Sequence, residues 1–129
     1  MSIAVEFISA TPILASLDIE KSVDFFASKL GFTKIHAVQG EYGIVGRGKV
    51  FLHFWACGDK HIAEATSCRV QVSGIQGLYE HCSQEEIVHP NALLSEKPWG
   101  TLEFAVLDID GNLITFYEQI NTLIKDVLP

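Results

Sequence analysis

One order of elements, a strand, a helix and then three short strands, is predicted twice along the 129 residues. The two copies are offset by about half the chain length, and no low-complexity linker separates them. Two βαβββ modules are therefore expected, at about residues 1–65 and 66–120, followed by a short C-terminal extension. Together they are expected to form a single domain of residues 1–129 in the α+β class.

The first module is predicted to begin with a strand at residues 11–17. Asp18 then offers a carboxylate to cap a helix, and Gly31 is a natural stop at its other end. The apolar side chains of this helix recur at helical spacing, at Ile19, Val23, Phe26 and Leu30. Turns that contain glycine separate three short strands, which are expected at residues 33–39, 42–45 and 50–55.

The second module repeats this order, starting with a strand at residues 67–72. Ser73 and Gln76 have the spacing of a capping box, which predicts the start of the second helix. The apolar side chains of that helix are Ile75, Leu78, Tyr79 and Cys82. Three further strands are expected at residues 87–89 or a little beyond, 102–107 and 113–118. A short terminal helix would carry apolar side chains at Leu123, Val127 and Leu128.

Side chains along residues 50–55 alternate between the two faces of the predicted strand. Those that would pack on the helix are Val50, Leu52 and Phe54. Those on the opposite face are Phe51, His53 and Trp55. A face with a histidine and a tryptophan suits the lining of a concave ligand surface. A sandwich core or an oligomer interface is the alternative interpretation.

The composition narrows the classes of partner. Acidic residues number 16 and basic residues 9, giving a formal charge of −7, which argues against nucleic acid because phosphate binding needs clusters of Lys and Arg. The excess of acid favours a cationic ligand, although it also serves solubility. With 48% hydrophobic residues, the chain can bury a substantial core.

The cysteines and the hydropathy bear on the compartment. Cys57, Cys68 and Cys82 are odd in number and form no C-x-x-C pair, so reduced thiols in a cytoplasmic protein are expected. The first residues carry no basic leader followed by a long apolar segment. No apolar run approaches the ~20 residues that span a bilayer, so no membrane partner is expected.

Three segments, residues 17–26, 30–32 and 108–112, resemble in order and spacing those of the vicinal-oxygen-chelate superfamily. This superfamily includes glyoxalases, extradiol dioxygenases, fosfomycin-resistance enzymes and bleomycin-resistance proteins. The resemblance extends over nearly the whole chain. It implies the glyoxalase/bleomycin-resistance fold, in which the enzymes hold a divalent metal in the cup of the sheet through His, Glu or Gln.

The positions that correspond to those metal ligands are Thr11, His53, Ser67 and Thr115. Only His53 is a competent ligand for a transition metal, and a catalytic zinc site typically has three protein ligands. We therefore expect no metal, no cofactor and no catalytic residue. A metal-dependent enzyme of the same superfamily, a lyase or a thiol transferase with displaced ligands, remains the alternative, as does a reaction in which His53 is the general base.

Within the superfamily, residues 97–100, Lys-Pro-Trp-Gly, and the Glu-Phe-Ala of residues 103–105 look most like those of bleomycin-resistance proteins. Those proteins sequester the drug without altering it. The resemblance implies two aromatic plates that clasp the drug's planar bithiazole, here Trp99, beside Gly100, and Tyr42. Stacking of this kind contributes roughly 0.5–1.5 kcal/mol per aromatic pair beyond area burial. The alternative role for Trp99 is a structural anchor of its loop.

The remaining candidates for the ligand site follow from the chemistry of a flat, cationic glycopeptide. Glu41 and Glu103 are the carboxylates nearest to the plates in sequence, and they could balance a cationic tail. His53 and Trp55 would extend the floor of the pocket. A binder of another flat cationic small molecule would use the same residue types, because stacking surfaces tolerate different rings.

The resemblance also implies a homodimer in which the N-terminal strand crosses to the partner and the ligand grooves lie between subunits. Pro12 occupies the place of the hinge of this exchanged arm. A proline there would stiffen the arm, as it would an ordinary edge strand. By symmetry, two equivalent pockets would form in each dimer. The function expected is non-catalytic binding and sequestration of bleomycin-type glycopeptide antibiotics.

Overall fold

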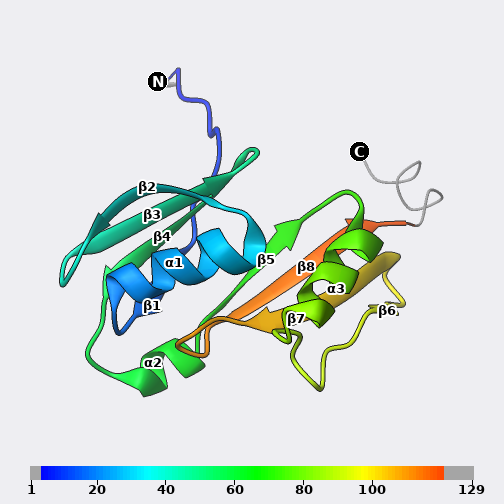
Figure 1. Ribbon diagram of the computed structural model, residues 1–129. Helices are drawn as coiled ribbons and strands as arrows, with labels where there is room; N and C mark the ends of the chain where they lie inside the picture. Colours follow the sequence, from blue (N-terminus) through cyan, green and yellow to red (C-terminus); the bar gives the residue numbers. More distant parts are fainter. Residues whose placement is uncertain (1–3, 121–129) are drawn as a thin grey trace.

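The computed structural model describes residues 4–120 (Figure 1). Its first half contains β1 (Ile13–Ser16), α1 (Ile19–Leu30), β2 (Thr33–Val38), β3 (Tyr42–Arg47) and β4 (Val50–Ala56). After these come α2 (Lys60–Glu64), β5 (Ser67–Gln71), α3 (Ile75–Gln84), β6 (Ser95–Glu96), β7 (Thr101–Leu107) and β8 (Leu113–Gln119). The predicted terminal helix within residues 121–129 lies outside the described residues.

The strands form two four-stranded sheets of the same design. Their orders are β1-β4-β3-β2 and β5-β8-β7-β6, so each strand of one sheet has a counterpart in the other. In each sheet the first edge strand is parallel to its neighbour, and the other pairs are antiparallel. The predicted α+β fold of two βαβββ modules is therefore confirmed. We call β1–β4 with α1 the N-terminal module, and β5–β8 with α3 the C-terminal module.

Helix α1 begins and ends where the sequence predicts. The Asp18 side chain accepts a hydrogen bond from the Lys21 N–H at 3.1 Å. Gly31 ends the helix with a φ of 68°, a left-handed conformation that glycine adopts without strain. The predicted apolar stripe is buried, and its members are Ile19, Val23, Phe26 and Leu30. No helix within residues 4–120 is both long and apolar enough to cross a bilayer.

The predicted capping box of the second helix is wrong. Gly74, not Ser73, caps α3, and it makes no side-chain cap because it has none. Glu118, which belongs to β8, accepts hydrogen bonds from the N–H groups of Gly74 and Ile75, each at 2.8 Å. A carboxylate from the neighbouring strand thus replaces the local cap and places negative charge at the positive end of the helix.

The predicted strand at residues 87–89 is also wrong. Only an isolated bridge between Val88 and Val106 forms there, and the edge strand of the sheet is the two-residue β6. Pro90 lacks a backbone N–H and interrupts the ladder after the His89 N–H donates to the Ala105 carbonyl at 2.8 Å. Helix α2 was not expected from the sequence. Its short span gives little periodicity to detect.

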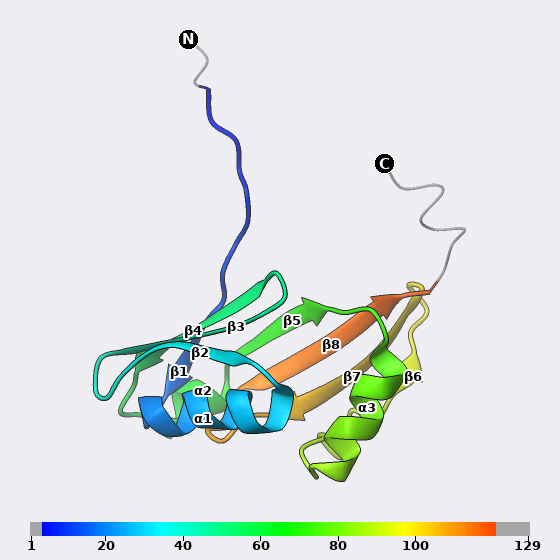
Figure 2. The ribbon, with the colours of Figure 1, turned by 45° about the horizontal axis from the view of Figure 1, so that its top comes forward.

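Helices α1 and α3 each cover one face of the sheet in their own module (Figure 1). Phe54 and Leu52 of β4 are fully buried on the α1 side, and Phe104 of β7 meets Tyr79 of α3 edge to face. These contacts belong to one hydrophobic core that runs through both modules. We call the opposite faces of the two sheets the open faces. The N-terminal arm, residues 4–12, projects away from the body of the molecule (Figure 2).

A buried turn joins the two modules. The Asn112 side-chain amide donates to the Ala15 carbonyl in β1 and to the Asp108 carboxylate, both at 2.8 Å. Its oxygen accepts from the Thr66 hydroxyl. Because Asn112 is fully buried, none of these groups could turn to water instead. The Asp-Gly-Asn turn of residues 110–112 therefore also connects the last strand of one module to the first strand of the other.

We predict that Asn112→Ala lowers the free energy of unfolding by about 2–4 kcal/mol, because it leaves buried donors and acceptors without partners. Urea unfolding followed by circular dichroism measures the change. Asn91→Ala is the matched control, since Asn91 is exposed. Equal stability of the two variants would show that the amide contributes nothing to the joint.

Candidate functional site

The open face of the N-terminal module carries the predicted aromatic residues of β4. Phe51, His53 and Trp55 alternate with the buried Leu52 and Phe54, as predicted. Phe51 and Trp55 are exposed large hydrophobic side chains. Ile13 of β1 and Ile35 of β2 are exposed as well. Exposed apolar groups that gather on one face mark a surface for a ligand or another chain.

Tyr42 and His53 form a pair on this face. The register of the sheet places Tyr42 opposite Trp55 and Ile44 opposite His53. The Tyr42 hydroxyl and His53 Nδ1 are 2.8 Å apart, and the two rings meet edge to face with centroids 5.4 Å apart. Three predicted site residues, Tyr42, His53 and Trp55, are thus brought together. Glu41 is exposed in the turn just before Tyr42.

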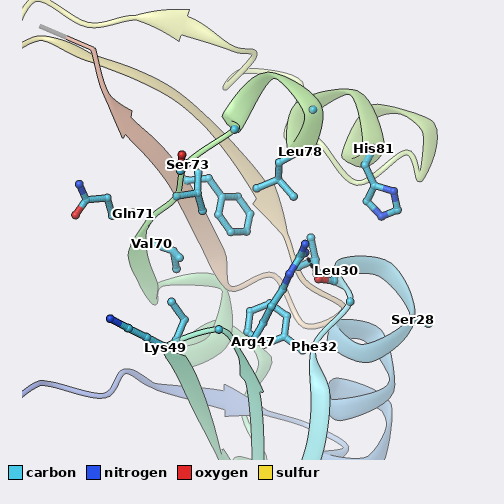
Figure 3. A pocket seen from close by; sticks show the side chains of 17 residues that line it. Ser28, Leu30, Phe32, Arg47, Lys49, Val70, Gln71, Ser73, Leu78 and His81 are labelled. Carbon is cyan, nitrogen blue, oxygen red and sulfur yellow. Dashed lines mark hydrogen bonds between the residues drawn. The ribbon is translucent and has the colours of Figure 1, made fainter.

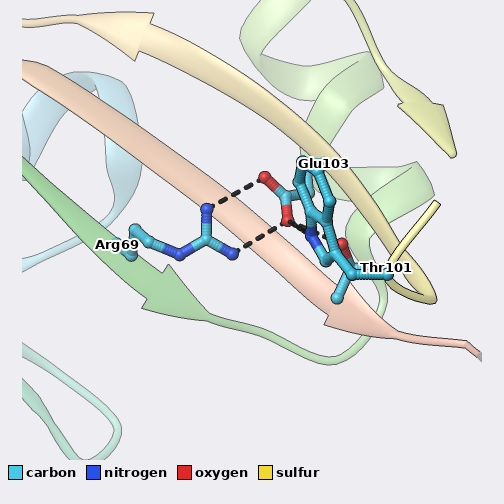
Figure 4. A network of polar contacts seen from close by, with 4 residues as sticks. Arg69, Thr101 and Glu103 are labelled. Atoms are coloured by element: carbon cyan, nitrogen blue, oxygen red, sulfur yellow. Dashed lines mark hydrogen bonds and ion pairs between the residues drawn. The ribbon is translucent and has the colours of Figure 1, made fainter. Parts of the chain in front are cut away.

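The open face of the C-terminal module carries an ion pair between Arg69 of β5 and Glu103 of β7 (Figure 4). Arg69 donates to the Glu103 carboxylate through both terminal guanidinium nitrogens, Nη1 and Nη2, at 3.0 and 2.8 Å. The Arg69 guanidinium also stacks over the ring of Tyr117 in β8, 4.5 Å from its centroid. A planar guanidinium matches a carboxylate in this two-point geometry.

Trp99 is hydrogen-bonded to the same carboxylate. Its indole Nε1–H donates to Glu103 Oε2 at 2.9 Å, and the Thr101 hydroxyl donates to the same oxygen at 2.6 Å. Gly100 sits in the turn between them with a φ of 90°, a conformation that favours glycine. Glu103 is 4% exposed, whereas Trp99 is 55% exposed. The indole is therefore held at its nitrogen while much of its surface stays in water.

The electrostatics of Glu103 follow from these contacts. Hydrogen bonding to Arg69 is the main cause that lowers its pKa to about 2, and burial opposes the shift. Both carboxylate oxygens accept hydrogen bonds from the protein, and Arg69 balances the charge. Glu103 is thus paired within the chain and also bonded to Trp99. Its predicted contact with a cationic tail stays a prediction.

Arg69 was missed by the sequence analysis. The signal that could have found it is its position in the strand at residues 67–71, two residues after Ser67, because side chains alternate and both must share a face.

Thr115 of β8 lies opposite both Arg69 and Ala105 in the sheet. Within residues 4–120, no group of three or more His, Cys, Asp or Glu side chains could hold a metal ion.

Two hollows lie where the modules meet. The larger, about 970 Å³, is lined by the end of α1, the turn between β3 and β4, β5 and α3, and none of the predicted site residues lines it (Figure 3). The smaller, about 230 Å³, brings Pro12 of the arm together with Phe51 and Arg69 from the two open faces. The Pro12 carbonyl accepts a hydrogen bond from the His53 N–H at 3.1 Å.

The two predicted plates belong to different modules. Tyr42 begins β3 of the first sheet, and Trp99 precedes β7 of the second. Among residues 4–120, no aromatic pair joins them. The structure therefore brings together one group around Tyr42 and another around Trp99, each on an open face, without uniting the two groups in one chain.

Proteins with similar sequences match this chain over nearly their whole length. A bleomycin resistance protein of Geobacillus stearothermophilus is 35% identical over 132 aligned positions, which cover 89% of this chain and 99% of the relative. A bleomycin resistance protein of Staphylococcus aureus has the same identity and coverage. No family model matches the chain.

Solved structures share the fold. The bleomycin-binding protein of the bleomycin producer Streptomyces verticillus, in complex with copper(II)-bleomycin, superposes with a TM-score of 0.78 and 28% identity over 91% of this chain and 98% of that one. A bleomycin resistance determinant encoded on the transposon Tn5 gives a TM-score of 0.75 and 25% identity over 88% and 98% of the respective chains. With a 35% identical relative matched over almost its whole length, the chain belongs to the bleomycin resistance protein family.

Proposed function

We propose that this protein binds bleomycin-type glycopeptide antibiotics and sequesters them without chemical change. The observation that carries the proposal is Trp99, an indole that is 55% exposed yet fixed at its nitrogen by Glu103. A flat aromatic face that is held in place but left uncovered is suited to stacking on a planar heterocycle. The similar Streptomyces verticillus protein, whose structure contains copper(II)-bleomycin, supports the same ligand class.

Charge supports a cationic ligand. The formal charge of −7 raises the encounter rate with a positively charged drug and opposes its escape. Because Arg69 already balances Glu103, the contact with a cationic tail falls to exposed carboxylates such as Glu41. Another flat, cationic small molecule would meet the same groups, so competition between ligands decides which one is preferred.

The ligand pocket in this proposal lies between two copies of the chain. The open face around Tyr42 and Trp55 is aromatic and apolar, whereas the open face around Arg69 and Glu103 is charged. A two-fold axis that places one face opposite the other would bring Tyr42 of one protomer near Trp99 of its partner. Both copies of such an interface are equivalent, so each dimer would contain two pockets.

The N-terminal arm supports this dimer. Phe7 is 96% exposed and Ile8 is 81% exposed, which a single protomer does not explain. Pro12 fixes the base of the arm, because its ring restricts φ and its carbonyl is bonded to β4. We infer that the arm crosses to the partner with Pro12 as the hinge.

The free thiols of Cys57, Cys68 and Cys82 fit a reducing compartment, so we place the protein in the cytoplasm.

The function is tested by titrating metal-free bleomycin into wild-type protein and recovering the drug. Saturable binding and an unchanged drug mass after release support sequestration. Release of a modified drug would instead indicate catalysis, for which His53 is the base to examine first.

We predict that Trp99→Ala weakens bleomycin binding about tenfold or more, because it removes one stacking surface. Isothermal titration calorimetry measures the dissociation constant. Ile62→Ala is the control, since Ile62 is an exposed apolar residue of α2 on no predicted site. Unchanged affinity in the Trp99 variant, with the control behaving like wild type, would refute the aromatic clasp.

We predict that the double variant Phe7→Glu, Ile8→Glu sediments as a monomer and loses most of its affinity for bleomycin, since four carboxylates would be forced into the dimer interface. Sedimentation velocity gives the oligomeric state. Gln76→Glu, Gln84→Glu adds the same charge to exposed positions of α3 and is expected to remain a dimer. An arm variant that stays dimeric would show that the arm is not exchanged.

A further inference from the structure

The Trp99 side chain is held by a hydrogen bond rather than by an apolar pocket. Its only hydrogen bond within the described residues runs from Nε1 to Glu103 Oε2. Tryptophan is usually highly buried, and packing normally fixes its ring. Here Trp99 is 55% exposed, so less packing is available to fix its ring. The orientation of the plate therefore depends on what holds its nitrogen.

We propose that Glu103, held by Arg69, is a positioning residue that presets the Trp99 ring for ligand stacking. This inference rests on the proposed function, since it assigns Trp99 to the ligand. It differs from the expectation that Glu103 contacts the charge of the ligand. Glu103 acts through Trp99, and Arg69 acts through Glu103.

The count of donors explains why a carboxylate is needed. Four donors converge on Glu103, two from Arg69 and one each from Trp99 and Thr101. A carboxylate accepts at both oxygens, whereas a glutamine amide accepts at one oxygen and would turn its NH₂ group toward other donors. Glutamine with its oxygen in place of Oε2 would point its NH₂ group at Nη1 of Arg69, and in the reverse orientation it would point that group at Trp99 and Thr101. Either orientation therefore breaks part of this network.

The anchor itself is kept in place by the sheet. Glu103 and Tyr117 are opposite each other on β7 and β8, and Gln71, two residues after Arg69, is opposite Tyr117. The Arg69 guanidinium lies over the Tyr117 ring and donates to both carboxylate oxygens of Glu103, so it has little freedom to move. A lysine would keep the charge but lose the planar, two-point contact.

The fixed orientation of the indole determines which chemical groups Trp99 can bind. With its N–H engaged, Trp99 presents only its π face, so it selects flat or cationic groups and not hydrogen-bond acceptors. Because the ring is ordered before the ligand arrives, binding avoids the entropy cost of immobilising it. The indole nitrogen thus contributes to affinity without touching the ligand.

The test uses the fact that the chain has only two tryptophans. In a Trp55→Phe background, Trp99 alone reports, and its fluorescence anisotropy decay and indole N–H exchange by NMR follow the ring without ligand. We predict that Glu103→Gln increases the fast local motion of Trp99 and speeds exchange of its indole proton about tenfold or more. Unchanged motion and exchange in a folded variant would overturn the proposal.

Binding of metal-free bleomycin is measured with the same substitutions made in the wild-type background, because Trp55 is itself a candidate ligand contact. Glu103→Gln is expected to weaken binding about tenfold, and Arg69→Lys is expected to show a smaller loss with intermediate ring motion. Glu80→Gln removes the same charge from an exposed site on α3 and is expected to bind like the wild-type protein. A mobile ring with undiminished bleomycin affinity would refute the positioning role. If the wild-type protein fails to bind the drug, the proposed function fails, while the ligand-free measurements still decide whether Glu103 orders the ring.

A pH profile separates this role from a general effect on folding. The pKa of Glu103 is lowered from 4.5 to about 2, so its contribution to stability is complete above about pH 4.5 and is lost as the pH falls toward 2. We predict that Trp99 anisotropy stays constant from about pH 7 to about pH 3.5. A step near pH 4.5, where an unpaired glutamate titrates, would show that Arg69 does not hold the carboxylate.

Discussion

Each module has one long helix for one sheet, and a helix covers only one face. Among residues 4–120, no helix other than the short α2 near β1 packs on the opposite face of either sheet. The core on the helix side is complete, with Phe26, Phe54 and Phe104 fully buried. Apolar side chains on the open face, such as Phe51 and Trp55, therefore need another partner. A ligand and a second copy of the chain are the two partners that the proposed function supplies.

The two open faces differ in chemistry although the modules share a topology. The N-terminal face is rich in aromatic and aliphatic groups, and the C-terminal face is built around the Arg69–Glu103 pair. One fold used twice thus yields one face of aromatic and apolar side chains and one face built around an ion pair. The difference lies in alternate strand positions alone, which can change without disturbing the buried side of each strand.

Local patterns predicted the parts of the fold that depend on neighbours in sequence. The Asp18 cap, the Gly31 stop and the alternation around His53 are all contained within a few residues, and all were found. The cap of α3 could not be predicted, because Glu118 lies 44 residues after Gly74 in the sequence. Ser73 looked like the better local cap, but the strand neighbour supplies the stronger acceptor.

The same reasoning applies to the site. Trp99 and Tyr42 were predicted as aromatic plates from the family resemblance, and their role remains a prediction. The bond between Trp99 and Glu103 spans only four residues, yet its meaning depends on Arg69, 34 residues before Glu103. Only the pairing of β5 with β8 and of β8 with β7 brings the arginine into reach. A carboxylate that looked available in sequence is therefore already committed in the fold.

The most direct test of the whole account is the stoichiometry of bleomycin binding to the wild-type protein, measured by calorimetry together with the mass of the complex. We predict saturable binding of one drug per chain, two per dimer, with the drug released intact. Absence of heat and of tryptophan quenching at micromolar drug, or one drug per monomer with no dimer formed, would contradict it.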